Sequence, residues 1–173
     1  MKEIIREFED GVDRAQVVEV WQRVFGYETA HNEPNFAINK KLAMRDGLFF
    51  VAAVGEKVVG TIMAGYDGHR GWIYSVAVLP EYRRRGVGTR LTRHAEERLK
   101  SLGCPKINLQ ILQENKAVEA FYRKLGYDTE QRISMGKKIP ENIVSARPSA
   151  PLKGDRSMPS GNREIAQERP QES

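Results

Sequence analysis

Apolar residues recur along the chain with two different periods, which predict a mixture of strands and helices. Short apolar runs with a period of two predict strands, and stripes with a period near 3.6 predict helices. The predicted strands cover residues 3–8, 48–54, 57–64, 72–79, 107–112 and 127–139. The predicted helices cover residues 10–25, 34–45, 88–102 and 116–125. This order of elements predicts a mixed α/β sheet that is antiparallel in its first half.

The helical stripes and the turns between elements follow from particular residues. The two longest stripes consist of Val17, Val18, Trp21, Val24 and Phe25, and of Val87, Leu91, Ala95, Leu99 and Leu102. Glycines at positions 26, 103 and 126 follow helical stripes and are typical of helix ends. Two hairpin connections are predicted, one at Gly55-Glu56 and the other over Asp67–Gly71.

The last part of the chain differs in composition from the rest. Residues 140–173 hold five of the eight prolines and no aromatic residue. Such a segment buries too little apolar surface to offset the entropy of ordering, so we expect it to be disordered. The prediction is therefore one domain over residues 1–139, followed by a disordered tail over 140–173.

Composition excludes several classes of protein. Cys104 is the only cysteine, so an internal disulfide is excluded and a reducing cytoplasm is expected. The three histidines are scattered, which argues against a metal site, and no apolar run predicts a membrane span. The net charge is +5, and residues 140–173 contribute five basic and five acidic residues, so the excess lies in residues 1–139.

Much of that excess lies close to one turn, residues 83–88 (Arg-Arg-Arg-Gly-Val-Gly), called here the basic glycine turn. It follows the predicted strand 72–79 and opens the predicted helix 88–102. The N-terminus of a helix offers unpaired N–H groups and a favourable dipole, and glycine lets a phosphate approach closely. The sequence therefore predicts a site for a phosphorylated ligand.

Two motifs in order resemble those of the GNAT superfamily of acyl-CoA-dependent N-acetyltransferases. Val78-x-Pro80 followed by Arg83-x-x-Gly86-x-Gly88 is similar to its coenzyme A pyrophosphate motif, and Asn115-x6-Tyr122-x-x-Leu125-Gly126-Tyr127 is similar to its second motif. The resemblance covers roughly residues 48–137. Residues 65–71 and 103–107 are also similar to those of one bacterial member.

The resemblance implies a fold and a donor. The fold is a mixed, mostly antiparallel sheet flanked by four helices, whose fourth and fifth strands splay apart. The donor is acetyl-CoA, with no metal. Its pyrophosphate would bind at Arg83, Arg84, Arg85, Gly86, Val87, Gly88 and Thr89. The main chain at Val76 and Val78 would pair with the pantetheine arm, and the N–H near Val78 would polarise the thioester carbonyl.

The resemblance also gives Tyr122 the role of general acid. A phenol with a pKa of about 10 is protonated at neutral pH and can give its proton to a departing thiolate. Without the motif, Tyr122 would be interpreted as a core aromatic residue. Asn115 is expected to cap the helix 116–125, and the resemblance adds a contact with the pantetheine arm.

The base that deprotonates the amine is left open. In the branch of the family that acetylates ribosomal-protein N-termini, a glutamate stands where this chain has Gln110, and an amide cannot accept the proton. Deprotonation through ordered water, held by Tyr74 and Ser75, is the preferred route, with Glu114 and His31 as other candidates. Three further residues share the loop 26–33 that in the family shapes the acceptor site: Tyr27, Glu28 and Glu33.

The predicted function is transfer of acetyl from acetyl-CoA to a primary amine by direct attack in a ternary complex. The amine could be a protein N-terminus, a lysine or a small molecule, and the protein a monomer or a homodimer in the cytoplasm. The main alternative is a non-catalytic acyl-CoA-binding sensor. A nucleic-acid-binding domain is disfavoured because the aromatic residues do not alternate with the basic ones.

Overall fold

The computed structural model describes residues 3–26 and 33–139. The chain divides into two units, residues 1–129 and 130–173. The first unit contains a five-stranded sheet in the order β1-β2-β3-β4-β5. The strands are β1 (Glu3–Glu7), β2 (Phe49–Val54), β3 (Lys57–Tyr66), β4 (Gly71–Val78) and β5 (Ile107–Asn108). The first four are antiparallel neighbours, and β5 runs parallel to β4.

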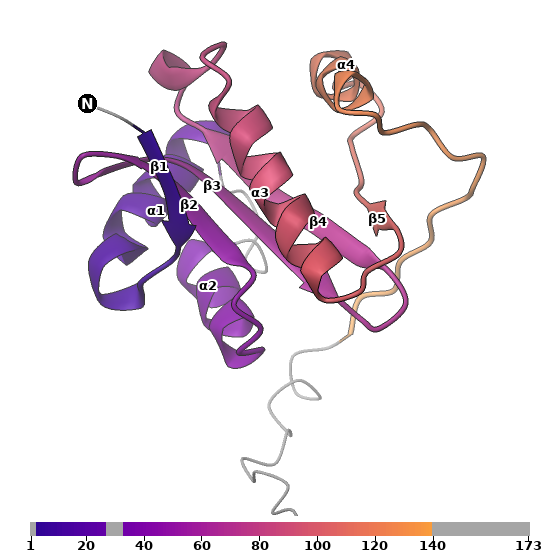
Figure 1. Cartoon of the computed structure of the whole chain (residues 1–173), viewed down its shortest axis with the longest axis horizontal. Helices are drawn as coiled ribbons and strands as arrows, with labels where there is room; N and C mark the ends of the chain where they lie inside the picture. The colour runs from indigo at the N-terminus through magenta and orange to yellow at the C-terminus, as the bar shows by residue number, and fades with distance from the viewer. Residues whose placement is uncertain (1–2, 27–32, 140–173) are drawn as a thin grey trace, which may run out of the picture. The chain divides into compact units, whose positions relative to one another are not determined.

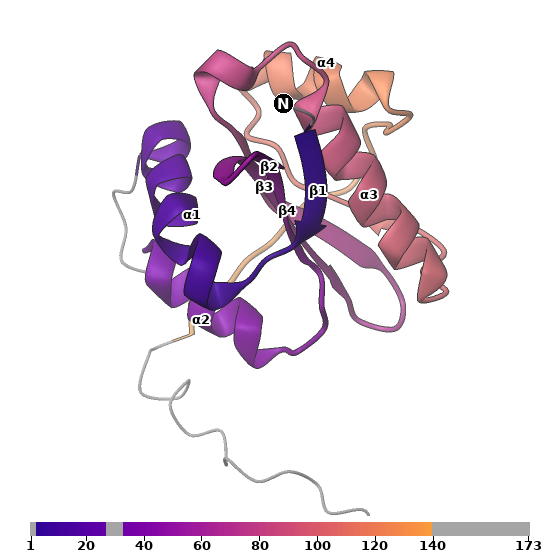
Figure 2. The same ribbon diagram turned by 60° about the vertical axis from the view of Figure 1, so that its left-hand side comes forward.

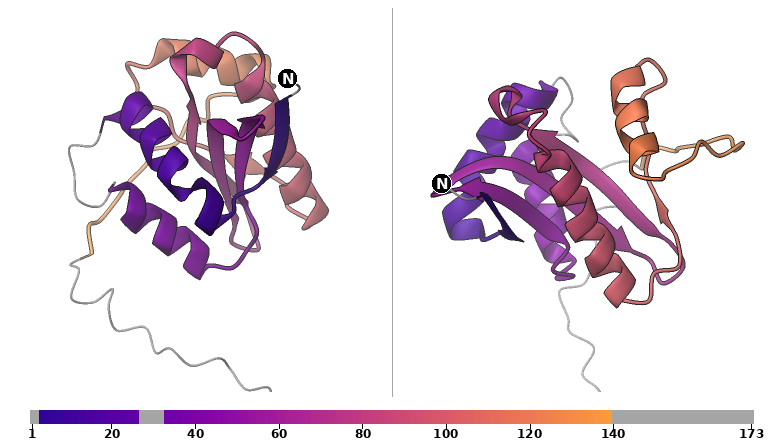
Figure 3. Two further views of the ribbon diagram at one scale, coloured as in Figure 1. Left: turned by 90° about the vertical axis from the view of Figure 1, so that its left-hand side faces the viewer. Right: turned by 45° about the horizontal axis from the view of Figure 1, so that its top comes forward.

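The helices cover the two faces of this sheet. Helices α1 (Asp10–Phe25) and α2 (Pro34–Ala43) lie on one face and α3 (Val87–Ser101) lies on the other (Figures 1 and 2). Helix α4 (Lys116–Lys124) follows β5, and a short 3₁₀ helix, η2 (Pro80–Tyr82), joins β4 to the turn before α3. Two further views show the three layers and the position of α4 beside the β5 side of the sheet (Figure 3).

Alternation along the strands produces two hydrophobic cores. In β2, Phe49 and Val51 pack with residues of α1 and α2, whereas Phe50 and Ala52 pack with residues of α3. A strand that is covered on both faces buries successive residues, and all of residues 49–53 are buried.

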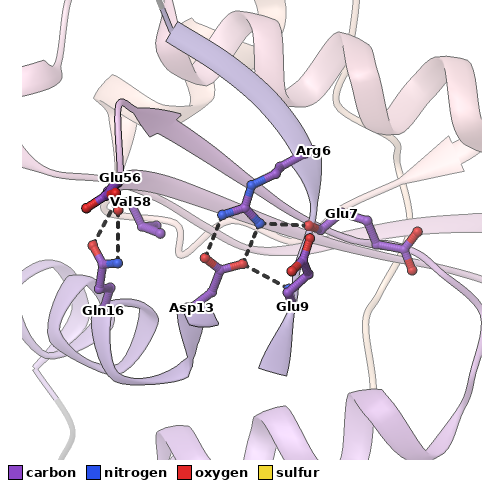
Figure 4. Close-up of polar contacts among 7 residues, drawn as sticks. All are labelled: Arg6, Glu7, Glu9, Asp13, Gln16, Glu56 and Val58. Carbon is purple, nitrogen blue, oxygen red and sulfur yellow. Dashed lines mark hydrogen bonds and ion pairs between the residues drawn. The ribbon is translucent and has the colours of Figure 1, made fainter. Parts of the chain in front are cut away.

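Polar contacts fix α1 to the sheet (Figure 4). The buried carboxylate of Asp13 accepts two hydrogen bonds from Arg6, at 2.6 and 2.8 Å, and one from the N–H of Glu9 at 2.9 Å. One turn further on, the Gln16 amide donates to the carbonyl of Glu56 and accepts from the N–H of Val58. Gln16 thereby ties α1 to the turn between β2 and β3.

Most predicted elements are confirmed, and the helix over residues 10–25 has the predicted bounds. Both predicted hairpins are present, because β2 and β3 flank Gly55-Glu56 and β3 and β4 flank the turn at Asp67. The first four strands agree to within two residues at each end, and α2 ends two residues before the predicted end.

Three predictions are wrong. No strand is assigned within residues 127–139, where Ile133 and Met135 are each 91% exposed, so neither packs on a core. The fifth strand has two residues instead of six, because β5 pairs with only the first two residues of β4, Gly71 and Trp72. Phe25 and Leu102 are exposed, since each lies at the end of its helix, beyond the covered part of the stripe.

The predicted disordered tail, residues 140–173, lies outside the described residues, so its boundary stays a prediction. Among residues 3–26 and 33–139, no helix is long and apolar enough to cross a membrane.

Candidate acetyl-CoA site

A β-bulge interrupts the pairing of β4 with β3. Thr61 faces Ala77 and Met63 faces Tyr74, so two β4 residues, Ser75 and Val76, stand opposite one β3 residue. Ser75 has a φ of 51°, in the left-handed region that non-glycine residues rarely adopt. Such a bulge bends a strand and redirects the groups beyond it. β4 is therefore bent at Ser75 and Val76, before it reaches Val78.

On its other edge, β4 is paired with β5 only at its first two residues. β5 pairs with β4 only at Gly71–Ile107 and Trp72–Asn108, whereas β4 continues to Val78. Within the described part of the chain, no strand covers the rest of that edge. The edge that includes Val76 and Val78 is thus the place where an extended ligand could pair with the main chain, as in strand addition.

The basic glycine turn follows β4 after the short helix η2 and starts α3. The helical N-cap is Gly86, with a φ of 79°, and the first intrahelical bond runs from the N–H of Arg90 to the carbonyl of Gly86. The N–H groups of Val87, Gly88 and Thr89 lie before the first intrahelical hydrogen bond, so the helix itself offers them no acceptor. The glycine N-cap has no side chain that could accept from them. This is the donor arrangement that binds a phosphate.

The side chains of the turn have several different partners. The Nε of Arg83 donates to the carbonyl of Val78 at 3.0 Å, which fixes the turn on the end of β4. The guanidinium of Arg85 lies over the ring of Tyr82, with 5.4 Å to the ring centroid. Arg90 donates to the carbonyl of Arg85 and forms a two-bond ion pair with Glu3. Arg83, Arg84 and Arg85 are all exposed, so their positive charges lie on the side of the turn that faces solvent.

The two glycines of the turn differ in what surrounds them. A Cβ at Gly86 would lie 2.9 Å from an Nη atom of Arg90, in a backbone conformation that other residues rarely adopt. A Cβ at Gly88 would lie 3.4 Å from the ring of Phe121. Gly88 therefore allows the start of α3 to lie close to α4, which brings the second motif to the first.

Helix α4 carries Tyr122, which is 6% exposed. Its ring lies edge-on to those of Phe121 and Tyr127, with 4.9 and 5.4 Å between centroids. Burial, and then the negative charge of Glu96, raise the pKa of Tyr122 to about 12. The Tyr127 hydroxyl donates to Glu96 at 2.8 Å, which ties the end of α4 to α3. Tyr122 is thus both a packed aromatic residue and a phenol that stays protonated.

Asn115 is the N-cap of α4, as expected. Its side-chain oxygen accepts from the N–H of Val118 at 3.3 Å. A contact between Asn115 and the pantetheine arm stays a prediction.

The candidates for the base are in different places. Tyr74, 43% exposed, lies next to the bulge, and burial, followed by the charge of Asp46, raises its pKa to about 12. Glu33 caps α2 by accepting from the N–H groups of Asn35 and Phe36, and these bonds lower its pKa. Gln110 and Glu114 are both exposed on the segment between β5 and α4. Tyr27, Glu28 and His31 lie outside the described residues.

Two of the histidines that the sequence analysis did not assign to a metal site, His69 and His94, lie in the described residues. His69 is exposed in the turn closed by Asp67, whose carboxylate accepts from the N–H groups of His69 and Arg70. His94 packs edge-on against Phe50, and burial lowers its pKa. In the described parts of the chain, no group of three potential metal ligands is found.

One residue near the site was missed by the sequence analysis. The hydroxyl of Thr61, fully buried in β3, donates to the carbonyl of Ser75 at 3.0 Å and accepts from the indole N–H of Trp21 at 2.8 Å. The signal for Thr61 was present, because it is the one hydroxyl residue in the apolar strand predicted over 57–64. Trp21 was predicted only as part of an apolar stripe.

Comparison with known proteins identifies the family. A sequence model of the acetyltransferase (GNAT) family matches residues 14–127. The chain is 39% identical over 130 residues to Acetyltransferase ECA0875 of Pectobacterium atrosepticum, a match that covers 75% of this chain and 92% of the relative. The chain belongs to the GNAT acetyltransferase family. The closer likeness to one bacterial member stays a prediction.

Solved structures agree with this GNAT fold. A transcriptional regulator from Bacillus halodurans is 25% identical, with a TM-score of 0.63 over 79% of this chain and 100% of its own. The enzyme AAC(6')-Iy, solved with a bisubstrate analogue of CoA and acetylneamine, is 15% identical, with a TM-score of 0.65 over 81% of this chain and 100% of its own. The second likeness shows the fold alone. Membership of the GNAT family makes this chain an acetyltransferase whose donor is acetyl-CoA.

Proposed function

We propose that this GNAT protein transfers the acetyl group of acetyl-CoA to a primary amine by direct attack in a ternary complex. The observation that carries the proposal is the unpaired edge of β4, which is followed, after η2, by the glycine-capped N-terminus of α3. A thioester on a long arm with a pyrophosphate at its far end matches that pair of features.

The donor would bind through the main chain. The N–H groups of residues 84–89 would hold the pyrophosphate, and the exposed guanidinium groups of Arg83, Arg84 and Arg85 would add charge. The arm would pair with the edge at Val76 and Val78, where an N–H group would stabilise the oxyanion that forms on the thioester carbonyl. The structure of AAC(6')-Iy with a bisubstrate CoA analogue supports such a complex as one that this fold can form.

Tyr122 would act as the general acid. Attack of the amine on the carbonyl carbon forms a C–N bond, and the C–S bond breaks as the tetrahedral intermediate collapses. The leaving thiolate, with a pKa near 8.5, would take the phenolic proton from Tyr122. A raised pKa is compatible with this step, because it keeps the proton on the phenol until the thiolate forms.

The acceptor must lose a proton before it attacks, and we propose that ordered water near Tyr74 and Ser75 carries it away. Both residues lie at the bulge of β4, where the ladder with β3 is interrupted. Glu114 and His31 remain alternative bases. The class of amine, the cytoplasmic location and the monomeric or dimeric state all stay predictions.

The decisive experiment is a calorimetric titration with acetyl-CoA, followed by a thiol-release assay over a panel of amines. The panel would contain peptides with free N-termini, peptides with internal lysines, aminoglycosides and free amino acids. We expect saturable binding of acetyl-CoA and release of free coenzyme A with at least one class.

The same experiment tests the alternative function, a non-catalytic acyl-CoA sensor. That alternative is supported by Gln110, which stands where one branch of the family has a glutamate base. Tight binding of acetyl-CoA without thiol release for any amine would favour the sensor and contradict the enzyme.

A further inference from the structure

We infer that a buried relay, Trp21–Thr61–Ser75, holds the β4 bulge in the shape that acetyl-CoA needs, and that Thr61 and Trp21 are positioning residues. This inference rests on the proposed function. The relay is the pair of hydrogen bonds that pass from the Trp21 indole N–H to the Thr61 hydroxyl and from that hydroxyl to the Ser75 carbonyl. It joins α1 to β3 and β3 to β4.

The bulge needs an anchor because the sheet alone does not favour it. At the bulge, Ser75 has a positive φ, which costs backbone energy in a residue with a Cβ atom. Its carbonyl forms a hydrogen bond with a side chain, because the bulge interrupts the β3–β4 ladder between Thr61 and Met63. If that bond were lost, regular pairing of β4 with β3 would compete with the bulge.

The competing arrangement would damage the donor site. A change of register by one residue turns every following side chain and main-chain N–H to the opposite direction. From Ser75 onward, the residues affected include Val76 and Val78, whose main chain would pair with the pantetheine arm. The turn that follows would keep its contacts with α3 and β1, since Arg90 donates to the carbonyl of Arg85 and pairs with Glu3.

The relay is buried enough to act as a rigid connection. Trp21 is 1% exposed and Thr61 is fully buried, so the bond between them is closed to water, and the bond from Thr61 to Ser75 is partly buried. The Thr61 hydroxyl donates one bond and accepts another, and its hydrogen is therefore directed toward Ser75. Valine, which has almost the same shape, would leave both Trp21 and Ser75 without this partner.

The test separates the arm of the donor from its nucleotide. Full-length wild type, Thr61→Val, Thr61→Ser and Trp21→Phe would be titrated with acetyl-CoA and with 3′-phosphoadenosine 5′-diphosphate, which keeps the pyrophosphate and lacks the arm. In Thr61→Val we expect the acetyl-CoA Kd to rise about tenfold, the factor that corresponds to loss of the bond to Ser75, while the nucleotide Kd is unchanged. Thr61→Ser keeps the hydroxyl, so it should restore the wild-type ratio of the two Kd values.

Trp21→Phe keeps the ring packing and removes the first donor, so we expect a smaller rise of the acetyl-CoA Kd in the same direction. It also serves as the deciding variant if Thr61→Val does not fold. The inference would be overturned if Thr61→Val and Trp21→Phe, where folded, had the wild-type ratio of the two Kd values. It would also be overturned if Thr61→Ser were as impaired as Thr61→Val. If wild type itself bound no acetyl-CoA, the proposed function would fail first.

Discussion

At the scale of the single residue, Tyr122 is a packed aromatic residue for which we also propose the role of general acid. It packs in a cluster of three aromatic rings, and its hydroxyl has the raised pKa of a buried phenol. Packing depends on the ring, and acid catalysis depends on the hydroxyl. A substitution that removes only the hydroxyl therefore distinguishes the two.

We expect Tyr122→Phe to lower kcat by about 10²-fold or more, the usual contribution of a general acid, with little change in the Kd of acetyl-CoA. Thiol-release kinetics and calorimetry would measure the two quantities. Tyr66→Phe is a matched control, because its hydroxyl donates to the carbonyls of Gly68, in the hairpin, and Gly103, just after α3. Equal loss of turnover and affinity in Tyr122→Phe would make Tyr122 a packing residue.

The pH dependence of turnover tests the same group. Burial and Glu96 raise the pKa of Tyr122 to about 12, so the phenol keeps its proton as the pH rises past the ordinary value of about 10. The acid function is lost only as the pH rises through the raised pKa. We therefore expect kcat to show no fall between about pH 8 and 10 from this group. A fall in that range that disappears in Tyr122→Phe would contradict the assignment.

Gly86 allows a direct test of the phosphate site. Gly86→Asp adds bulk and negative charge beside the free N–H groups of α3, and we expect it to abolish detectable binding of acetyl-CoA. Gly103→Asp is the matched control, because Gly103 has a φ of 80° and lies just beyond the C-terminal end of the same helix, with nothing near its added Cβ. Normal affinity in Gly86→Asp would place the pyrophosphate elsewhere.

At the scale of the element, α1 is held by polar bonds as well as by its apolar face. Asp13 is fully buried, and its carboxylate accepts from Arg6 and from the N–H of Glu9. Burial alone would raise the pKa of Asp13, but the bonds from Arg6 and Glu9 outweigh it and the pKa is lowered. The ionised carboxylate is therefore a stabilising group at neutral pH.

We expect Asp13→Ala to reduce the free energy of unfolding by about 2–3 kcal/mol, because Arg6 would lose its buried partner. Asp10→Ala breaks an exposed pair with Arg14 on the same helix and should cost at most about 0.5 kcal/mol. Urea unfolding at neutral pH would compare them. Equal losses in the two variants would mean that burial of the Arg6–Asp13 pair adds nothing to the free energy of unfolding.

At the scale of the whole molecule, the described features of the site all lie in residues 1–129, the first compact unit. The sequence predicts that residues 140–173 are disordered and take no part in the donor site. A chain that ends at residue 139 should therefore keep the urea midpoint and the acetyl-CoA Kd of the full chain. A chain that ends at Leu125 is the contrasting variant, because it loses the bond from Tyr127 to Glu96 and should lose affinity. A large loss in the first truncation would assign the tail a role in the site.

The order of the elements and a phosphate site at the start of α3 could be predicted from the sequence because both depend on local patterns, whereas acetyl-CoA as the donor came from the resemblance to the GNAT family. Helix α1 follows from one apolar stripe, and the uncapped start of α3 follows from glycines in a short basic run. The features that decide how the site works depend on residues far apart in sequence. Thr61 meets Trp21 and Ser75 only after α1, β3 and β4 have packed, and Glu96 reaches Tyr122 only when α4 packs beside α3.

The same distinction explains the wrong predictions. The length of β5 depends on how far β4 and β5 stay together, and a strand within residues 127–139 would have needed a neighbour that periodicity cannot supply. Local propensity and spacing determined which elements form and which ligand chemistry they favour. Tertiary packing decided the register of β4, the burial of Tyr122 and the partner of each polar group, because hydrogen bonds between distant segments and exclusion of water exist only in the folded chain.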